Sequence, residues 1–488
     1  MVNTVYLGLA NFLAKFFSFF SSLLVLRLLT VDEAGVLTYG ISFITLFFPL
    51  LCLEFGSISF YYVPRLKNKL QKSFSILFIA LIIGVFVSIV LLLLRNNIIS
   101  LLNLVGYSGL SDYFLVLIFT GLMLFLYSLV LLVLQSINNF KTFFYCNIGQ
   151  SLFLLVLVVL DYCLAKFFSI NLLISRYRVT GLLIYYLISY IPFVIIGFSS
   201  VLKKFPFKLN FNFLKSFGKL TLQFYPVFFI SFGIPFVINN ILFFASKTEL
   251  SFLNLFQLYF LVLSFSVGSL ISAAIPLIIS KKRDFSFYTK LFTLYSLTFL
   301  FLAPLFAFVF PYATTILFSG KYANSLSFFP EFFLGMILWI FISVFILIFT
   351  SFKYNVWNIY FYIDLSLLVQ LIVFLVLGGN LLAYSLSLIA ASICLFLISF
   401  VKIREFRACA LENKRLLALF GLVVLCSYIL VKYIHSFFLS LLLVLMLFGF
   451  SLLFINVFNL IDFRVLSDLF STFKNKSIHY FRLIGFRK

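Results

Sequence analysis

Long apolar segments alternate with short polar segments over nearly the whole chain. A helix needs about 20 apolar residues to cross the hydrocarbon core of a bilayer, and about fourteen segments reach roughly that length. They lie near residues 5–26, 36–60, 74–94, 113–137, 143–164, 180–202, 221–245, 252–279, 291–316, 328–352, 356–377, 381–401, 416–431 and 436–457. This pattern predicts an all-α polytopic membrane protein with about 14 transmembrane helices.

The positive charges are distributed unevenly between the two sets of predicted loops. Most Lys and Arg residues follow even-numbered segments or lie in the C-terminal tail. Because Lys and Arg concentrate in cytoplasmic loops, both termini are expected in the cytoplasm. We therefore predict a multi-pass protein of the cytoplasmic (inner or plasma) membrane.

An internal repeat relates the two halves of the chain at an offset of about 216 residues. The segment Leu29–Glu33 aligns with Ala245–Glu249, and each follows an odd-numbered apolar segment. A basic cluster follows a proline at both Pro64 and Pro276. An even number of spans in each unit makes the repeat parallel, so we expect two pseudo-symmetric six-helix lobes plus two extra C-terminal helices.

The repeat divides the chain into five parts. The predicted parts are an N-lobe at 1–202, a basic cytoplasmic linker at 203–220, a C-lobe at 221–401, two further helices at 402–457 and a basic tail at 458–488.

Composition excludes several classes of protein. With 64% hydrophobic residues, a mean hydropathy of +1.23 and 10% charged residues, the chain is not a soluble globular protein. The net charge of +22 comes from short clusters between apolar segments, a pattern typical of loops facing anionic lipid rather than of nucleic-acid binding. The six cysteines show no CxxC spacing and there are two histidines, so we expect neither a metal site nor a disulfide framework. The sequence also lacks a phosphate-binding loop and known hydrolase motifs, which predicts a protein without cofactor that is not an enzyme.

Lys15 lies near the middle of the first apolar segment. A lysine at the centre of a membrane helix costs roughly 2.5–3.5 kcal/mol on insertion scales, so its side chain should face protein or water. It could bind an anion in a central cavity, or form an ion pair with Glu54 or another acid. Arg27, at the end of the same segment, is either a second binding residue or an interfacial residue whose charge reaches the membrane surface.

Other polar residues within the spans are candidates for binding or coupling. Glu54 and Asp364 could carry a coupling proton or cation, or simply pair with a nearby lysine or helix end. Asn239 and Asn240 follow Pro226 and Pro235 in one span. Their amides could bind sugar hydroxyls or satisfy backbone groups freed by the prolines.

Four basic residues next to predicted spans are candidates for lipid contact. Arg65, Lys67, Lys281 and Arg283 could bind lipid head groups without specificity, or guide a phosphorylated lipid toward a cavity.

Several motifs resemble polysaccharide flippases of the Wzx/RfbX (O-antigen) type, within the multidrug/oligosaccharidyl-lipid/polysaccharide exporter superfamily. They are LRLLTVDEAGVLTYG, LEFGSISFYYVPR, QFYPVFFISFGIPFVINN, AAIPLIISKKR and ILFSGKYANSLSFF. The resemblance covers roughly residues 5–400. The resemblance implies two lobes around a cavity with alternating access, which moves a polyprenyl-(pyro)phosphate-linked oligosaccharide for surface glycan assembly. The family's cationic cavity maps most naturally onto Lys15. It also implies membrane lipids as partners, together with a polysaccharide polymerase or glycosyltransferases, and we expect a monomer.

Two alternatives stay open at this point. The chain could be a cation-coupled multidrug exporter of the same superfamily, with Glu54 or Asp364 as the ion site. It could also be a non-transporting scaffold for glycan-synthesis enzymes.

Overall fold

The computed structural model describes residues 2–53, 69–103, 113–137, 139–170, 172–202, 209–261, 285–350, 356–434 and 436–457. Within these residues the regular elements are all helical. The first half contains α1 (Val2–Leu28), α2 (Val31–Ser42), the π-helix η1 (Phe43–Phe47), α3 (Phe48–Leu51), α5 (Lys69–Leu93), α6 (Arg95–Asn103), α7 (Phe114–Ser136), α8 (Phe140–Phe168), α9 (Leu173–Tyr177) and α10 (Val179–Leu202). The second half contains α11 (Phe211–Ala245), a helix at 247–261, α13 (Phe285–Phe318), η4 (Ala323–Ser327), α14 (Phe329–Thr350), α15 (Val356–Val376), α16 (Leu381–Lys402), α17 (Arg404–Glu412), α18 (Lys414–Tyr433) and α19 (Phe437–Val457).

The structure confirms a polytopic all-α membrane protein. Eleven helices of the described residues are long and apolar enough to cross a membrane, and two further apolar helices are shorter. Every one of the predicted apolar segments coincides, at least in part, with a described helix. For the predicted segment 252–279, the described part ends at residue 261.

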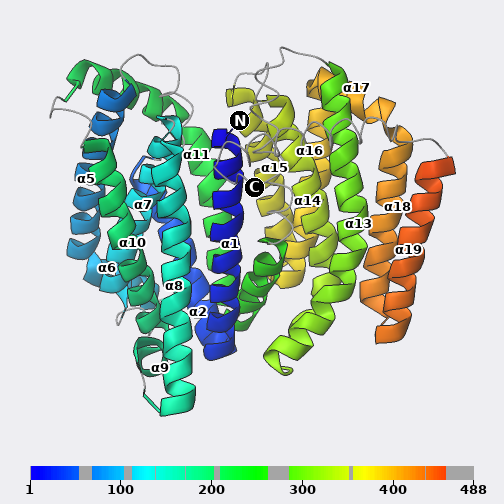
Figure 1. Ribbon diagram of the computed structural model, residues 1–488, viewed down its shortest axis with the longest axis horizontal. Coiled ribbons are helices and arrows are strands. Elements are labelled where there is room, and N and C mark those ends of the chain that lie inside the picture. The colour runs from blue at the N-terminus through cyan, green and yellow to red at the C-terminus, as the bar shows by residue number, and fades with distance from the viewer. Residues whose placement is uncertain are drawn as a thin grey trace, which may run out of the picture.

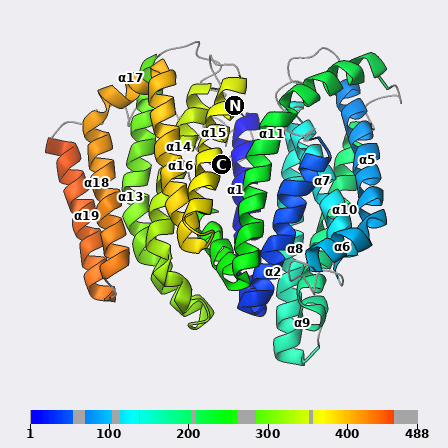
Figure 2. The same cartoon turned by 180° about the vertical axis from the view of Figure 1, so that it is seen from behind.

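The helices form two groups that stand side by side, as Figures 1 and 2 show from opposite sides. In the first group α1 packs along α8, and α7 packs along α10. In the second group α14 and α15 both pack on α16. The two C-terminal helices α18 and α19 pack against α13 and form the outer edge of this group (Figure 1). The arrangement matches the predicted two lobes with two additional helices.

The helices α2 and α11 join the two groups. Aromatic rings fill this contact: the Tyr39 ring lies 4.9 Å from that of Phe243, and the Phe47 ring 5.0 Å from that of Phe236. Such ring pairs contribute about 0.5–1.5 kcal/mol beyond the area that they bury. The contact therefore fixes α2 of the first group against the second.

The two aligned segments of the internal repeat form the same local structure. Thr30 caps α2, with the Glu33 amide donating to its Oγ1 at 3.2 Å. Ser246 caps the helix at 247–261 in the same way, with the Glu249 amide donating to its Oγ at 3.3 Å. A hydroxyl cap with a glutamate three residues later is a strong helix-start signal, and the chain uses it once in each half.

Two prolines break the regular helical hydrogen bonding where the groups meet. Proline lacks a backbone N–H and so leaves the carbonyl four residues earlier without its helical partner. Pro49 follows the π-helical turn η1, and Pro235 lies inside α11. Pro235 thereby removes the helical partner of the Ser231 carbonyl. These irregular turns lie in the walls of the cavity described below.

The predicted linker at 203–220 is helical over its second half. The helix α11 begins at Phe211, and the Asn210 side chain caps it by accepting from the Phe213 amide at 3.0 Å. Residues 211–220 contain no proline, so nothing in this stretch prevents the helix from extending into the basic segment. Residues 203–208 lie outside the described residues.

Candidate functional site

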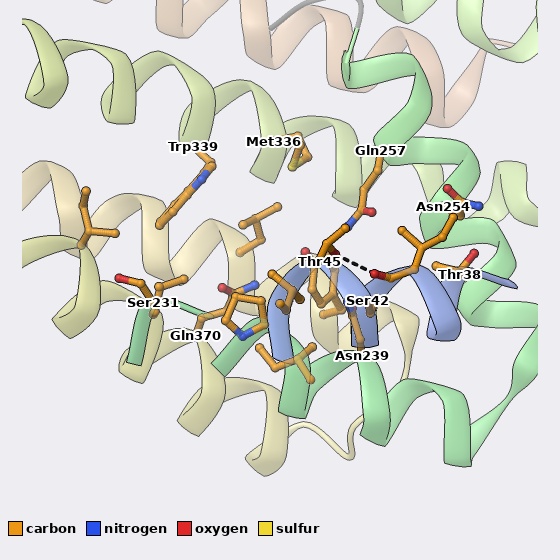
Figure 3. A pocket seen from close by; sticks show the side chains of 18 residues that line it. Thr38, Ser42, Thr45, Ser231, Asn239, Asn254, Gln257, Met336, Trp339 and Gln370 are labelled. Atoms are coloured by element: carbon orange, nitrogen blue, oxygen red, sulfur yellow. Dashed lines mark hydrogen bonds between the residues drawn. The ribbon is translucent and has the colours of Figure 1, made fainter. Parts of the chain in front are cut away.

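A cavity of about 570 Å³ lies between α2 and the helices of the second group (Figure 3). Its volume is within the range of about 300–1,000 Å³ that small-molecule sites occupy. The lining comes from α2 with η1, α11, the helix at 247–261, α14, α15 and α16. The polar lining residues are Thr38, Ser42, Thr45, Ser231, Asn239, Asn254, Gln257, Gln370 and Tyr384, and Trp339 adds an indole. The described lining includes no Asp, Glu, Lys, Arg or His.

Helical spacing places the hydroxyls of the first group in one row. Thr38, Ser42 and Thr45 follow each other at intervals of four and three residues, so they share one face of the helix. The η1 turn contains Thr45, and its hydroxyl donates to the Ile41 carbonyl at 2.7 Å. Single π-turns inside α-helices occur frequently at functional sites.

Neighbouring amides on α11 have different roles. The Asn239 side chain is buried, lines the cavity and donates to the Ser42 hydroxyl across the two groups at 2.9 Å. The Asn240 amide donates to the Phe236 carbonyl of its own helix at 2.6 Å. Of the two asparagines that the sequence singled out, Asn239 therefore belongs to the cavity and Asn240 serves its own backbone.

The opposite wall carries amides and aromatic rings. The side chains of Gln257 and Gln370 both interact with the Tyr384 hydroxyl. The Tyr384 ring stacks on Phe332 with 6.1 Å between centroids. Trp339 and Gln257 project from two other helices of this wall (Figure 3). The wall therefore presents both hydrogen-bond donors and acceptors beside an aromatic face.

Asp364 lies in the wall behind the cavity lining. It is 3% exposed, and its Oδ1 accepts a hydrogen bond of 2.5 Å from Ser231, which does line the cavity. The other fully buried acid, Asp161, has a different environment. Its carboxylate accepts from the Ser175 hydroxyl at 2.5 Å and the Tyr185 hydroxyl at 2.9 Å, as well as from two backbone amides. Asp161 thus holds α8, α9 and α10 together, whereas Asp364 connects to the cavity through one serine.

The two groups also touch at the end of the bundle where α1 ends. Lys321, in the turn after α13, donates to the Leu26 carbonyl at 2.8 Å and also to the Leu29 carbonyl. The unpaired carbonyls at a helix C-terminus carry partial negative charge, which attracts a cation. Burial lowers the pKa of Lys321, and the Glu33 carboxylate acts in the opposite direction.

A close backbone approach completes this contact. A Cβ atom added at Gly35 would lie 2.0 Å from the Lys247 carbonyl oxygen. Beside it, Glu33 forms an ion pair with Arg178 at 3.1 Å, and Arg178 also donates to the Leu28 carbonyl at 3.3 Å. We call the contact formed by Gly35, Lys247 and Lys321 the end contact.

The cavity lining does not include the cations predicted on α1. Lys15 and Arg27 have exposed side chains, and neither lines the cavity. The face of α1 next to Lys15 meets α8 through polar pairs, Asn147 to Asn11 at 2.9 Å and Ser18 to Ser151 at 3.3 Å. A binding role for Lys15 and Arg27 stays a prediction.

Five other predicted residues lie outside the described residues. They are Glu54, Arg65, Lys67, Lys281 and Arg283. Their roles in coupling and head-group contact stay predictions.

The sequence does contain a signal for the cavity residues that are not among the predictions above. Thr38, Ser42 and Thr45 recur with helical spacing inside an apolar segment, and so do Asn254 and Gln257, three residues apart. Polar rows of this kind indicate a face turned away from lipid. The sequence gives no such signal for Lys321. Lys321 is one of several basic residues in loops, and its role becomes visible only in the structure, where it lies beside the end of α1.

Comparison with known proteins identifies the fold. No protein-family profile matches the sequence, and no curated protein sequence matches it either. Among solved structures, lipid II flippase MurJ in an inward closed conformation matches with a TM-score of 0.61 and 16% identity, over 94% of this chain and 98% of that one. The MATE multidrug transporter DinF-BH matches with a TM-score of 0.54 and 14% identity, over 83% and 95%. A structure of MATE in complex with MaD5 matches with a TM-score of 0.52 and 15% identity, over 85% and 96%. The chain therefore has the two-lobe helical membrane fold that these flippase and multidrug-transporter structures share.

Proposed function

We propose that this protein moves a lipid-linked oligosaccharide across the cytoplasmic membrane by alternating access. One observation carries the proposal: a cavity of about 570 Å³ between the two lobes is lined by amides, hydroxyls and an indole in an otherwise apolar protein. Buried polar side chains are costly in a membrane unless they have a partner, so a row of them around a cavity favours a polar ligand. The fold that this chain shares with a lipid II flippase supports a lipid-linked cargo.

The physics of the substrate requires such a cavity. Sugar hydroxyls that enter hydrocarbon without partners cost several kcal/mol each. A cavity lined by donors and acceptors replaces their water partners during the crossing. The lipid tail has no such need, because it can stay in the bilayer beside the protein.

The phosphate of such a lipid carries negative charge, and Lys15 is the residue that we assign to it. Lys15 is an exposed residue of α1 and lies outside the cavity lining. Arg27 at the far end of α1, and Arg65, Lys67, Lys281 and Arg283 next to the membrane surface, extend this assignment to the entry and exit of the head group. An inside-negative potential, worth about 2.3 kcal/mol per charge per 100 mV, would favour outward movement.

In this proposal, the end contact determines the side of the membrane toward which the cavity is closed. With both termini in the cytoplasm, α1 ends at the outer face, so Gly35, Lys247 and Lys321 close the cavity toward the outside. Alternating access then requires this contact to break while a second contact forms at the cytoplasmic end.

A vesicle assay tests the function. Purified protein is reconstituted into liposomes with a fluorescent polyprenyl-pyrophosphate oligosaccharide, and a glycosidase added outside reports the sugars that reach the outer leaflet. We expect digestion to pass the half that protein-free liposomes allow and to approach completion. Digestion that stops at half in both samples contradicts the proposal and leaves a non-transporting scaffold as the alternative. If a Lys15→Ala variant reconstitutes equally well and moves the glycan at the wild-type rate, Lys15 has no role in the mechanism.

A second candidate is a cation-coupled multidrug exporter. It is favoured by the position of Asp364 behind Ser231 in the cavity wall and by the shared fold with MATE transporters. In this case Asp364→Asn, which keeps a hydrogen-bond partner for Ser231, abolishes export of cationic dyes driven by a proton or sodium gradient. For a flippase that uses the lipid's own charge, the same variant leaves glycan movement within about twofold of wild type.

A further inference from the structure

The chemistry of the cavity restricts the kind of saccharide that it can hold. This restriction rests on the proposed function and follows from the absence of charged side chains in the described lining. Amide and hydroxyl side chains contribute donors and acceptors but no full charge. The described lining includes no Lys, Arg or His that could pair with an anion.

Sugar hydroxyls suit these residues well. Each hydroxyl both donates and accepts, and so do the amides of Gln257 and Asn254 and the hydroxyl of Thr45. Trp339 adds a flat apolar face, against which the C–H face of a sugar ring can pack. Gln257 has an exposed side chain, so its amide is accessible to a ligand in the cavity.

A carboxylate-bearing sugar would meet a different environment. An anion taken from water into a site without a cation loses its hydration and gains no charged partner. Asp364 makes this worse, since its carboxyl lies directly behind Ser231, which donates to it at 2.5 Å. When ionised, Asp364 repels a second carboxylate; when protonated, it still supplies no positive charge.

We propose that the cavity between α2 and the helices α11, 247–261 and α14 to α16 binds uncharged sugar residues, such as neutral hexoses and N-acetylhexosamines, and excludes uronic and other acidic sugars. The saccharide moved by this protein therefore carries no carboxylate in the part that enters the cavity. The phosphate of the carrier stays outside this cavity.

Two lipid-linked substrates that differ by one carboxylate test the proposal. The vesicle assay is run with a polyprenyl-pyrophosphate trisaccharide of neutral sugars and with its counterpart in which one hexose is replaced by the matching hexuronic acid. We expect the neutral substrate to move at least about tenfold faster, the difference that about 1.4 kcal/mol produces. Gln257→Lys, which adds a cation on the exposed cavity wall, should reduce this preference by about tenfold, whereas Gln257→Met should keep it.

The outcomes separate this inference from the function on which it rests. Equal rates for both substrates, or faster movement of the acidic one, overturn the inference and leave the flippase function standing. Movement of neither substrate overturns both. A ratio between the two rates that Gln257→Lys leaves unchanged, whatever the rate on the neutral substrate alone, overturns the assignment of selectivity to this cavity.

Discussion

The cavity and the end contact are two places where the lobes meet, and they are built from opposite chemistry. The cavity lining is polar but uncharged, as in Ser42 and Asn239, which bond across the lobes at 2.9 Å. The end contact relies on the cation Lys321 and on the backbone approach at Gly35. The cavity is surrounded by apolar helices, whereas Lys321 lies in a turn between two of them.

This difference is what the proposed function requires of the two regions. Within the membrane a full charge costs several kcal/mol, so amides and hydroxyls can hold a polar ligand and release it again. At a helix end near water, a lysine can exchange carbonyl partners for solvent at little net cost. Partial burial, which lowers the pKa of Lys321, offsets part of what its hydrogen bonds contribute. A contact of modest net stability fits the proposed alternating access, in which this end must open in every cycle.

The largest expected effect comes from Gly35→Ala. The added Cβ would lie 2.0 Å from a backbone oxygen, which no rotamer change can relieve. We expect the closed end to lose about 1–3 kcal/mol, the usual cost of overpacking. Spin labels at the exposed residues Arg27 and Asn324, in different lobes, would report a longer distance in electron paramagnetic resonance.

Gly421→Ala is the matched control, because its Cβ would meet no heavy atom within 4 Å. If both variants show the wild-type distance, the approach at Gly35 does not determine closure.

The next effect is that of Lys321→Met, which keeps the length of the side chain and removes its charge. The carbonyls of Leu26 and Leu29 lose their lysine donor, and hydrogen bonds to charged groups contribute about 1.5–3 kcal/mol. We expect the same distance measurement to show a population shift of about tenfold toward the open end, with Lys321→Arg intermediate. An unchanged distribution would mean that the lysine contributes nothing to the closure.

The adjacent residues Asn239 and Asn240 of α11 separate the role of the cavity lining from that of helix stability. Asn239→Leu removes the bond to Ser42 and one lining amide, and bonds between membrane helices average about 0.6 kcal/mol with a maximum near 1.7. We expect glycan movement in the vesicle assay to fall about threefold to fivefold. Asn240→Leu, whose amide bonds only to its own helix among the interactions seen, should stay within twofold. Equal losses in both variants would assign the effect to helix stability rather than to the cavity.

The smallest effect is expected at the repeated helix caps. Glu33→Ala removes the carboxylate that accepts from the Thr30 amide at the start of α2, and Glu249→Ala removes the one that accepts from the Leu381 amide at the start of α16. A cap contributes about 1 kcal/mol. The ion pair of Glu33 with Arg178 adds little, because the two side chains are 28% and 44% exposed. We expect similar small decreases in the melting temperature in detergent. A much larger decrease for one variant would show that the two halves use this motif differently.

The fold could be predicted from the sequence because apolar segment length and the repeat depend on local pattern. The capped starts at Thr30 and Ser246 are one example, since the two aligned segments form the same structure. The cavity could be predicted only in part. Asn239 and Asp364 are predicted as polar residues within spans, whereas the row from Thr38 to Thr45 is not among the predictions although its spacing is local. The contact of Lys321 with α1 joins residues almost 300 positions apart, and no local pattern encodes such a contact.

Photo-crosslinking tests most directly whether the saccharide occupies the cavity between the lobes. A neutral lipid-linked trisaccharide with a diazirine on its terminal sugar is bound to the reconstituted protein, illuminated and mapped by mass spectrometry. The account predicts crosslinks on the cavity-lining parts of η1 and of the helix at 247–261, at Thr45, Asn254 and Gln257. Crosslinks confined to α18 and α19 at the outer edge of the bundle, with none in the cavity, would contradict it.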